Sequence, residues 1–554
     1  MILGRIWGTL DPFLETGPIL GRRVANLQFL RALLRADPFD EYHFFIGDRA
    51  ARESLGEHLG QFFPDLAEQG KLRLLDRRNL PRALAEHDYH CFHQSDCITH
   101  PPHLARLRNA ASREIFPVTG PIHSLSYANY GALLLAHLWP GATPRDCIVT
   151  TSSAGRDVVE RFFEGLRSGY DLSPGAYPGP SLRRIPLAVD TGDLQPVDRD
   201  GRRIAREKLD LDTERTWLLV FGRVSHYSKM DLLPLLRAFQ RLFAEGVDPK
   251  SVGLLLGGWT EDGDEHSETL RAFARNIGLE LRLFPRPGEI AKLDLYRAAD
   301  VFVSIADNPQ ETFGLTVLEA MAMGLPVLAS DYDGYKDTVA HGETGLLVPT
   351  LGPSATPALD DLAPLLYDNQ YHLLLAQQTA VEVPALAAAV RRLLDSPEAR
   401  AAMGAAGRLR VEDRFSWPVV VAAHVALWEE LWTLPVDPAP LRDRVHPSQV
   451  AYGRIFGGYP TRALRGDDIL TAGRTGEAIY RRKDHPVVYA GLEGVLDEKA
   501  LGKLPFLARN PLSADELAER VREAFPALSP DRIEFLLLWA LKQDILERRE
   551  ARTS

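Results

Sequence analysis

The stretch "QETFGLTVLEAMAMGLPVLASD" (residues 310–331) contains the pieces of one α/β unit. It follows the apolar run "DVFVSIAD" (residues 300–307), which has the length and composition of a buried strand. A helix is expected to start near Gly314, because "LTVLEAMAM" is rich in good helix formers, and to stop at Gly324 before Pro326. The next strand is then "LPVLASD". The stretch therefore predicts a parallel sheet covered by helices.

The same alternation of apolar runs and amphipathic segments continues through about the first 430 residues, in two halves. It predicts an α/β protein with two Rossmann-like, doubly wound domains, residues 1–200 and 201–434, that face a cleft. Ligands of such sheets bind at the strand ends. The expected strands are residues 42–48, 90–96, 114–120 and 146–152 in the first half, and residues 216–223, 252–258, 279–285, 300–307, 325–331 and 344–349 in the second.

Two further segments depart from this alternation. Residues 350–384 interrupt the second half and are expected to be an insertion. Residues 435–554 are expected to be a Pro/Gly-rich linker and a small, mainly helical module with a winged-helix-like fold, in which Ser513 and Glu516 form a capping box. Because residues 441–554 hold 19 Lys and Arg against 17 Asp and Glu, a protein partner or self-association is favoured over nucleic acid.

Composition narrows the class of protein. The chain has 554 residues and a formal net charge of -11, which disfavours broad binding to nucleic acid or anionic lipid. Its three cysteines have no metal-type spacing, so they are expected to pack in the core of a protein from a reducing compartment. The first residues lack a secretion signal, and no apolar run reaches the length of a spanning helix. A cytoplasmic location is expected, with peripheral membrane contact left open.

Glu311 and Glu319 have different positions in the predicted unit. Glu311 lies in the loop before the helix, whereas Glu319 lies more than one turn inside it. The backbone N–H groups of "ETFGL" and the helix N-terminus suit a phosphate, and carboxylates suit the hydroxyls of a sugar or ribose. The spacing therefore indicates a ligand with sugar, phosphate and sugar in sequence.

A basic pair occurs upstream, in "FGRVSHYSKM" (residues 221–230). Arg223 offers a bidentate fork and Lys229 a compact charge, and together they can neutralise a diphosphate without a metal. The acidic runs "DGD" (residues 262–264) and "DYD" (residues 331–333) imitate metal-binding pairs, but they are expected to be loop acids. No essential metal and no cofactor are expected.

These motifs resemble the retaining family 4 glycosyltransferases of GT-B fold. The resemblance rests on "E-x-FGL-x-x-x-E" at residues 311–319 and on Gly222 and Arg223 followed six residues later by Lys229. It implies that Glu311 contacts the transferred sugar, Glu319 the ribose, and Arg223 with Lys229 the diphosphate. It further implies donor contacts in both loops, from Gly222, Thr312, Phe313, Gly314 and Leu315.

The first half matches the family less closely. The family has a Gly-Gly loop after the first strand, whereas this chain has "TGPILGRR", with Gly17 and Gly21 apart; Gly21 is carried over as a donor-binding residue. His123 in "VTGPIHSLSY" occupies the place of the family's sugar-contacting histidine and is assigned a catalytic role. His93 and His100 are its competitors.

The resemblance implies transfer of a sugar from a nucleoside diphosphate sugar to a glycan, a lipid-linked or a small-molecule acceptor, with retention and without a metal. Two alternatives stay open at this point. One is a nucleotide-sugar epimerase of similar fold. The other is a non-catalytic sensor that binds a nucleotide sugar.

Overall fold

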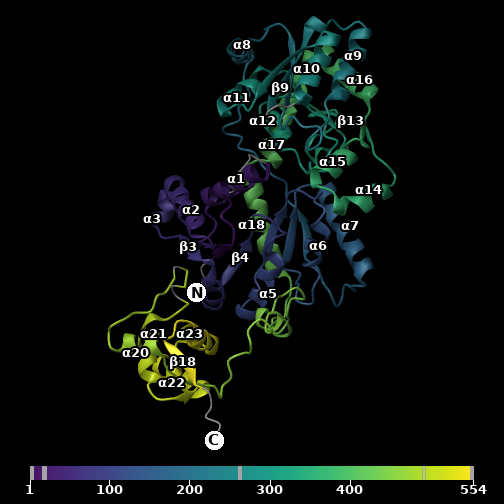
Figure 1. Ribbon diagram of the computed structural model, residues 1–554. Coiled ribbons are helices and arrows are strands. Elements are labelled where there is room, and N and C mark those ends of the chain that lie inside the picture. The colour runs from purple at the N-terminus through teal and green to yellow at the C-terminus, as the bar shows by residue number, and fades with distance from the viewer. Residues whose placement is uncertain (1–4, 15–20, 260–264, 490, 493–494, 550–554) are drawn as a thin grey trace. The chain divides into compact units, whose positions relative to one another are not determined.

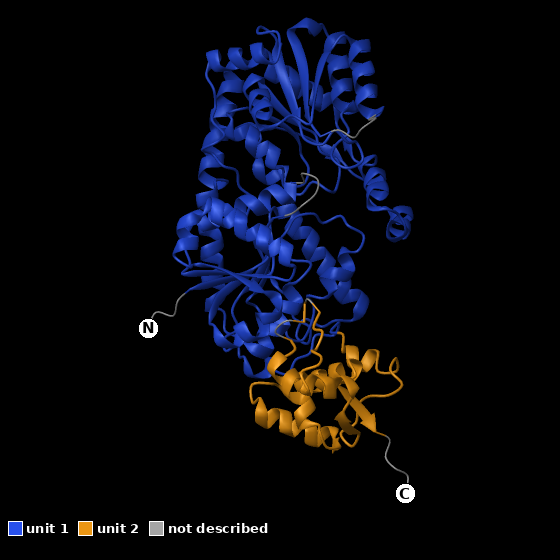
Figure 2. Ribbon diagram, turned by 60° about the vertical axis from the view of Figure 1, so that its left-hand side comes forward, with its two compact units in different colours: residues 1–449 blue, residues 450–554 orange. Residues whose placement is uncertain are grey.

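The computed structural model describes residues 5–14, 21–259, 265–489, 491–492 and 495–549. The chain divides into two compact units, residues 1–449 and 450–554, and each has its own hydrophobic core (Figure 2). The larger unit contains two parallel sheets, and the smaller one contains helices and a short antiparallel sheet.

The first sheet has seven parallel strands in the order β3-β2-β1-β4-β5-β6-β7. The direction of winding reverses between β1 and β4, which is where doubly wound sheets bind ligands. The strands are β1 (Ile6–Thr9), β2 (Glu41–Ile46), β3 (Leu72–Asp76), β4 (Tyr89–His93), β5 (Val118–Ile122), β6 (Asp146–Thr150) and β7 (Ser181–Arg184). The helices of this domain are α1 (Gly21–Ala36), α2 (Arg49–Phe62), α3 (Pro64–Glu68), α4 (Leu80–Glu86), α5 (Pro101–Ala111), α6 (Tyr130–Leu135) and α7 (Ser153–Tyr170).

The second sheet has six parallel strands in the order β10-β9-β8-β11-β12-β13. Its winding reverses between β8 and β11, so the loops after these two strands start side by side. The strands are β8 (Thr216–Phe221), β9 (Val252–Gly258), β10 (Glu280–Pro285), β11 (Val301–Ser304), β12 (Val327–Ser330) and β13 (Gly345–Val348). The helices are α8 (Arg199–Lys208), α9 (Leu233–Ala244), α10 (Glu265–Ile277), α11 (Glu289–Ala298), α12 (Leu315–Ala322), α13 (Tyr335–Thr338), α16 (Val383–Asp395) and α17 (Pro397–Arg414).

The two sheets confirm the doubly wound fold expected from the sequence, with a difference at β5. The expected strand covered residues 114–120, whereas β5 is Val118–Ile122. Ile115 and Phe116 are buried before the strand starts, so their hydrophobicity reflects packing of the connection from α5 and not strand pairing. The short strands β1, β3 and β7 were not expected.

Helix α18 (Trp417–Thr433) returns from the second sheet domain to the first. Trp417 and Trp428 lie in one core cluster with Trp7 and Phe29, and the indole N–H of Trp428 donates to Thr119 Oγ1 at 3.0 Å. Figure 1 shows α18 in green beside the purple and blue elements of the first sheet. The core of the first domain is therefore completed by residues from the range 201–434.

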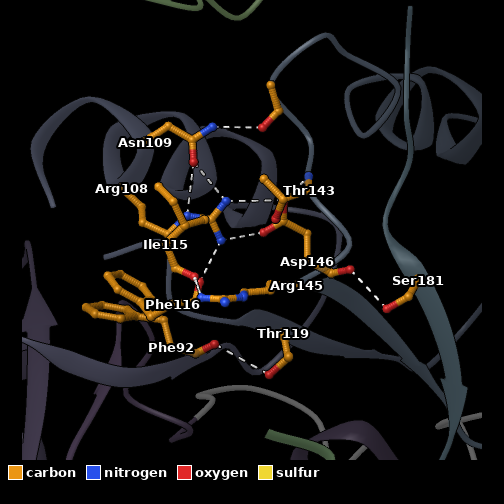
Figure 3. A network of polar contacts seen from close by, with 11 residues as sticks. Phe92, Arg108, Asn109, Ile115, Phe116, Thr119, Thr143, Arg145, Asp146 and Ser181 are labelled. Carbon is orange, nitrogen blue, oxygen red and sulfur yellow. Dashed lines mark hydrogen bonds and ion pairs between the residues drawn. The ribbon is translucent and has the colours of Figure 1, made fainter. Parts of the chain in front are cut away.

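A buried ion pair ties α5 to β6 (Figure 3). The guanidinium of Arg108, whose side chain is 0% exposed, donates to Asp146 Oδ1 at 2.6 Å and to the carbonyl oxygen of Phe116 at 2.7 Å. Asp146 also accepts from the backbone N–H of Thr143, and Asn109 accepts from Arg108 and donates to the Gly141 carbonyl. The partners of this buried cation thus come from α5, from the start of β6 and from the connection before β5.

We expect Arg108→Met to lower the free energy of unfolding by about 3–5 kcal/mol, because it leaves the Asp146 carboxylate buried without its cation. Chemical denaturation of the full chain measures this change. Arg113→Met, at an exposed arginine five residues away, is the matched control and should change stability by less than about 0.5 kcal/mol. Equal effects of the two substitutions would show that the pair does not hold α5 in place.

The insertion is built on a two-stranded antiparallel base, β14 (Thr350–Leu351) and β15 (Ala380–Val381). Two helices, α14 (Pro357–Leu362) and α15 (Asp368–Ala376), lie between these strands. The remaining short helical turns of the chain are η1 (Arg77–Asn79), η2 (Pro249–Ser251), η3 (Ala363–Leu365) and η4 (Ala439–Leu441).

The smaller unit is mainly helical, as expected, and the capping box of Ser513 and Glu516 is present. Its three antiparallel strands have the order β17-β16-β18. The last of these strands, β18, pairs with β16 from the start of the module. The elements are α19 (Tyr452–Ile455), β16 (Ile469–Ala472), α20 (Arg474–Tyr480), α21 (Glu498–Leu507), β17 (Leu512–Ser513), α22 (Ala514–Ala524), α23 (Pro530–Lys542) and β18 (Leu546–Arg549).

The three cysteines, Cys91, Cys97 and Cys147, are buried and unbridged, which confirms their expected role in core packing. Burial raises the pKa of the Cys147 thiol to about 12, so it stays protonated at neutral pH. Within the described ranges, no helix has both the length and the apolar character that crossing a bilayer requires.

Candidate functional site

The loop between β11 and α12 has the conformation that the sequence predicted. Gly314 is the N-cap of α12, with φ 97° and ψ 64°, a left-handed conformation that glycine adopts without strain. A Cβ at this position would lie 2.4 Å from Cε1 of Tyr335, so the ring packs directly under the loop. The helix therefore starts at Leu315, and Glu311 lies in the loop before it.

Lys229 and Glu311 form an ion pair across the switch point of the second sheet. Their side chains are 16% and 9% exposed. Burial alone would raise the pKa of Glu311, but the Lys229 ammonium outweighs this effect and holds the pKa below its usual value. The site therefore presents an ionised carboxylate, paired with Lys229, in the loop between β11 and α12.

Tyr335, on α13, forms a hydrogen bond to the Glu311 carboxylate. Its hydroxyl lies 2.6 Å from Ser304 Oγ and donates to Glu311 Oε2 at 3.2 Å. Burial, together with the Glu311 charge, raises the pKa of this phenol well above its usual value, so it remains a neutral donor. The backbone N–H of Phe313 is a further donor to Glu311 Oε1, at 3.3 Å. The sequence analysis did not identify Tyr335, which is distant in sequence from Glu311.

We expect Tyr335→Phe to lower kcat/KM about tenfold, because it removes a hydrogen bond to a charged group while keeping the ring under Gly314. Steady-state kinetics with the donor found by the assay described below would measure it. Tyr42→Phe, which removes a tyrosine hydroxyl bonded to Asp37 in the first domain, is the control and should leave kcat/KM unchanged. A Tyr335→Phe enzyme with wild-type kcat/KM would contradict this positioning role.

Arg223 lies in the loop after β8, together with Lys229. Its guanidinium donates to the hydroxyl and carbonyl oxygens of Ser228 at 3.2 and 3.1 Å. Burial lowers the pKa of Arg223, although the Glu311 carboxylate opposes this effect. The buried side chain of Asn308 donates to the Tyr227 carbonyl at 2.8 Å, so it joins the basic loop to the Glu311 loop. Asn308 is a further residue that the sequence analysis missed.

Glu319, inside α12, belongs to a second cluster of polar side chains. Lys292 Nζ lies 2.7 Å from Glu319 Oε1, and the Tyr296 hydroxyl donates to Oε2 at 2.9 Å. Both partners come from α11, where residues four apart share one helix face. The four-residue spacing of Lys292 and Tyr296 is a feature of the sequence that could have identified them as neighbours. The two glutamates thus have separate partners; that they address different parts of a ligand stays a prediction.

The first domain contributes His123, which follows β5. Its Nε2 lies 3.0 Å from both Asn26 Oδ1 and the Ser95 carbonyl oxygen. The hydroxyl of Thr312, in the Glu311 loop, donates to the backbone carbonyl of His123. The structure therefore brings His123 next to the loop that carries Glu311.

Of the competing residues, His93 lines one pocket together with His123 and Asn26. His93 is buried among aromatic rings, its Nδ1 lies 2.8 Å from Thr119 Oγ1, and burial lowers its pKa well below the usual value. His100 Nε2 lies 3.9 Å from Asp11 Oδ1. Gly21 is the first residue of α1, and a Cβ there would meet no heavy atom within 4 Å. Gly17 lies outside the described residues.

The acidic runs were expected to be loop acids. Burial, together with the Glu311 carboxylate, raises the pKa of Asp333 to about 8, so this side chain is largely protonated at neutral pH. Residues 262–264 lie outside the described part of the chain. Within that part, no group of three or more His, Cys, Asp or Glu side chains is arranged to hold a metal ion. The expectation that no metal is needed stays a prediction.

Two doubly wound sheets, each with charged or polar loops at its switch point, define the GT-B fold that the resemblance implied. A glycosyltransferase from Rickettsia africae has this fold, with a TM-score of 0.51 and 14% identity over 78% of this chain and 100% of its own. HepE from Anabaena, solved in complex with UDP, has a TM-score of 0.50 and 17% identity, with the same coverage. At these identities the likeness is one of fold.

Residues 201–372, which contain the second sheet, match the family model of the glycosyl transferases group 1. D-inositol 3-phosphate glycosyltransferase from Rhodococcus jostii is 34% identical over 172 residues, which are 31% of this chain and 37% of that protein. Its counterpart from Kineococcus radiotolerans is 30% identical over 256 residues, 44% and 50% of the two chains. The matches span half or less of the length of these relatives.

Proposed function

We propose that the protein is a glycosyltransferase that moves a sugar from a nucleoside diphosphate sugar to a hydroxyl group of a glycan, a lipid-linked or a small-molecule acceptor. The proposal includes retention at the anomeric carbon and no need for a metal or cofactor. The observation that carries it is the meeting of Glu311, Lys229, Arg223 and the start of α12 at the switch point of the second sheet.

The chemistry follows from the charges of this site. When the bond between the anomeric carbon and the diphosphate oxygen breaks, negative charge grows on the diphosphate and positive charge on the sugar. The negative charge on the diphosphate is stabilised by Arg223, Lys229 and the N-terminus of α12. Glu311 binds sugar hydroxyls. The acceptor oxygen forms the new bond on the same face of the sugar, and its proton passes to the departing phosphate oxygen.

The first-domain side of the site supplies the acceptor surface in this proposal. His123, held by Asn26 and the Ser95 carbonyl, faces the transferred sugar. Because HepE was solved with UDP, UDP-sugars are the first donors to test. The names of the inositol phosphate relatives make inositol phosphates the first small acceptors to test, beside extracts that contain glycans and lipids.

The test is a panel of nucleotide sugars given to the full chain in the presence of a chelator, with inositol 3-phosphate or a cell extract as acceptor. We expect one donor to yield a glycosylated product whose anomeric configuration matches that of the donor. Glu311→Ala should abolish most of this turnover, whereas Glu343→Ala, at an exposed glutamate, should retain it.

The other outcomes point to the alternative functions. Loss of activity on chelation would overturn the metal-free mechanism. Isomerised nucleotide sugar without transfer would favour an epimerase. Binding of donors without turnover in any extract would favour a sensor. Cytoplasmic location, peripheral membrane contact and recruitment of a partner by residues 450–554 are separate proposals, which cell fractionation and co-purification test.

A further inference from the structure

Helix α15 of the insertion reaches from the second sheet domain to the segment that follows His123. Asp368 Oδ1 accepts from the backbone N–H of Ala128 at 3.2 Å, and Nε2 of His372 lies 3.0 Å from the Ser126 carbonyl oxygen. The two side chains are four residues apart, so they lie on one face of the helix. That face is therefore directed at the backbone of residues 126–128.

The other end of the insertion is fixed to the donor side. Gln377, just after α15, donates from Nε2 to Asp231 Oδ2 at 3.4 Å, and Asp231 lies two residues after Lys229. At the base of the insertion, the hydroxyl of Thr350 donates to the Asp331 carbonyl at 3.0 Å. The helix thus spans the distance between the loop of Lys229 and the segment after His123.

A third contact holds the same first-domain segment. The Thr312 hydroxyl donates to the His123 carbonyl, as described above. Residues 123–128 are therefore held at His123, Ser126 and Ala128 by groups of the second sheet domain, two of which come from α15.

We propose that α15 is a positioning element that fixes the loop after β5, with its His123, relative to the Lys229 and Glu311 loops. Asp368 and His372 are its positioning residues. The proposal deepens the proposed function, since its catalytic meaning rests on sugar transfer between these loops. The contacts themselves can be tested without any turnover.

The nature of the contacts favours positioning over stabilisation of the fold. They are hydrogen bonds to backbone atoms, and part of the insertion is open to solvent: Leu365 is 81% and Tyr367 79% exposed, whereas His372 is buried. One hydrogen bond shifts a local equilibrium by up to about tenfold, which is enough to order a loop but small against the stability of a domain. The helix is therefore suited to hold the segment without being needed for folding.

Hydrogen–deuterium exchange of the full chain without ligand tests the contact directly, because the Ala128 amide is itself one of the bonded groups. We expect Asp368→Ala combined with His372→Ala to speed exchange in residues 124–130 about tenfold or more, and to speed it less in the strands of the two sheets. Asp368→Asn keeps an acceptor oxygen and His372→Gln an N–H donor, so these variants should restore much of the protection. Gln370→Ala, at an exposed position of the same helix, is the matched control.

Kinetic measurements distinguish a loss of positioning from a general loss of binding and activity. With the donor that turns over, we expect the double alanine variant to lose about tenfold in transfer, while its affinity for UDP stays within about twofold of wild type. Unchanged exchange in residues 124–130, or an equal loss of transfer and of UDP binding, would overturn the proposal. If wild type transfers no sugar at all, the proposed function fails, and the positioning contact is then judged by exchange alone.

Discussion

Lys229→Met is expected to reduce kcat/KM by two to three orders of magnitude, because removal of one preorganised charge from a developing anion has effects of this size, on the order of 10²–10³. The ammonium is the cation that meets Glu311, and it is placed for the leaving diphosphate. Steady-state kinetics with the donor from the panel would measure the loss. Lys336→Met, at an exposed lysine of the same domain, should have no effect.

The same substitution should change how stability depends on pH. In wild type the folded pKa of Glu311 is depressed, so its stabilisation is present at neutral pH and lost as pH falls through that pKa. Without Lys229, only the hydrogen bonds from Phe313 and Tyr335 oppose burial, and we expect the folded pKa to rise above the unfolded value. The variant should therefore lose stability relative to wild type as pH rises from about 4 to about 8. A constant difference across this range would contradict the charge pairing.

Gly258→Ala is expected to lower the free energy of unfolding by about 3 kcal/mol or more, since overpacking against backbone cannot be relieved by a rotamer change. The added Cβ would lie 1.7 Å from the Gly222 carbonyl oxygen, and φ at Gly258 is 139°. Gly222 starts the loop of Arg223 and Lys229, so affinity for the donor should fall as well. Denaturation and calorimetry with UDP measure the two effects.

Gly246→Ala separates the two causes of this loss. Gly246 has φ 93°, but a Cβ there would meet no heavy atom within 4 Å. Its substitution should therefore cost only the backbone strain, about 1–2 kcal/mol, and should leave UDP binding unchanged. Equal losses for the two alanine variants would show that contact with Gly222 is unimportant.

The sequence predicted the second domain more fully than the first, for a physical reason. Most of its strands are buried apolar runs such as residues 252–258, where all seven residues of β9 are buried; the edge strand β10 is the exception. In the first sheet, β3 and β7 lie at the edges and carry arginines, so their pattern resembles that of loops. The return of α18 to the first core could not be predicted, because periodicity identifies an apolar face but not the sheet that it covers.

The residues of the site were likewise predicted in part from the sequence and missed in part. Local spacing was sufficient to place Glu311, Arg223 and Lys229 in loops that follow the adjacent strands β8 and β11, and Glu319 inside the next helix; their roles stay predictions. Tyr335 and Asn308 act through contacts between segments distant in sequence, at 3.2 Å to Glu311 and 2.8 Å to the Tyr227 carbonyl. Such partners depend on how α13 and two loops pack. The contacts of α15 with residues 126–128 depend on the arrangement of two domains, which no local pattern encodes.

The return of α18 to the first domain also constrains how the second domain can be exchanged with that of another protein. An exchange of donor domains made with one junction near residue 200 would bring a foreign Trp417 and Trp428 into the core around Trp7. A working chimera would keep α18 with the first sheet and place its second junction between Arg414, where α17 ends, and Trp417. The interchangeable part of this chain is therefore an internal segment, and both its ends must be matched to the recipient at the same time.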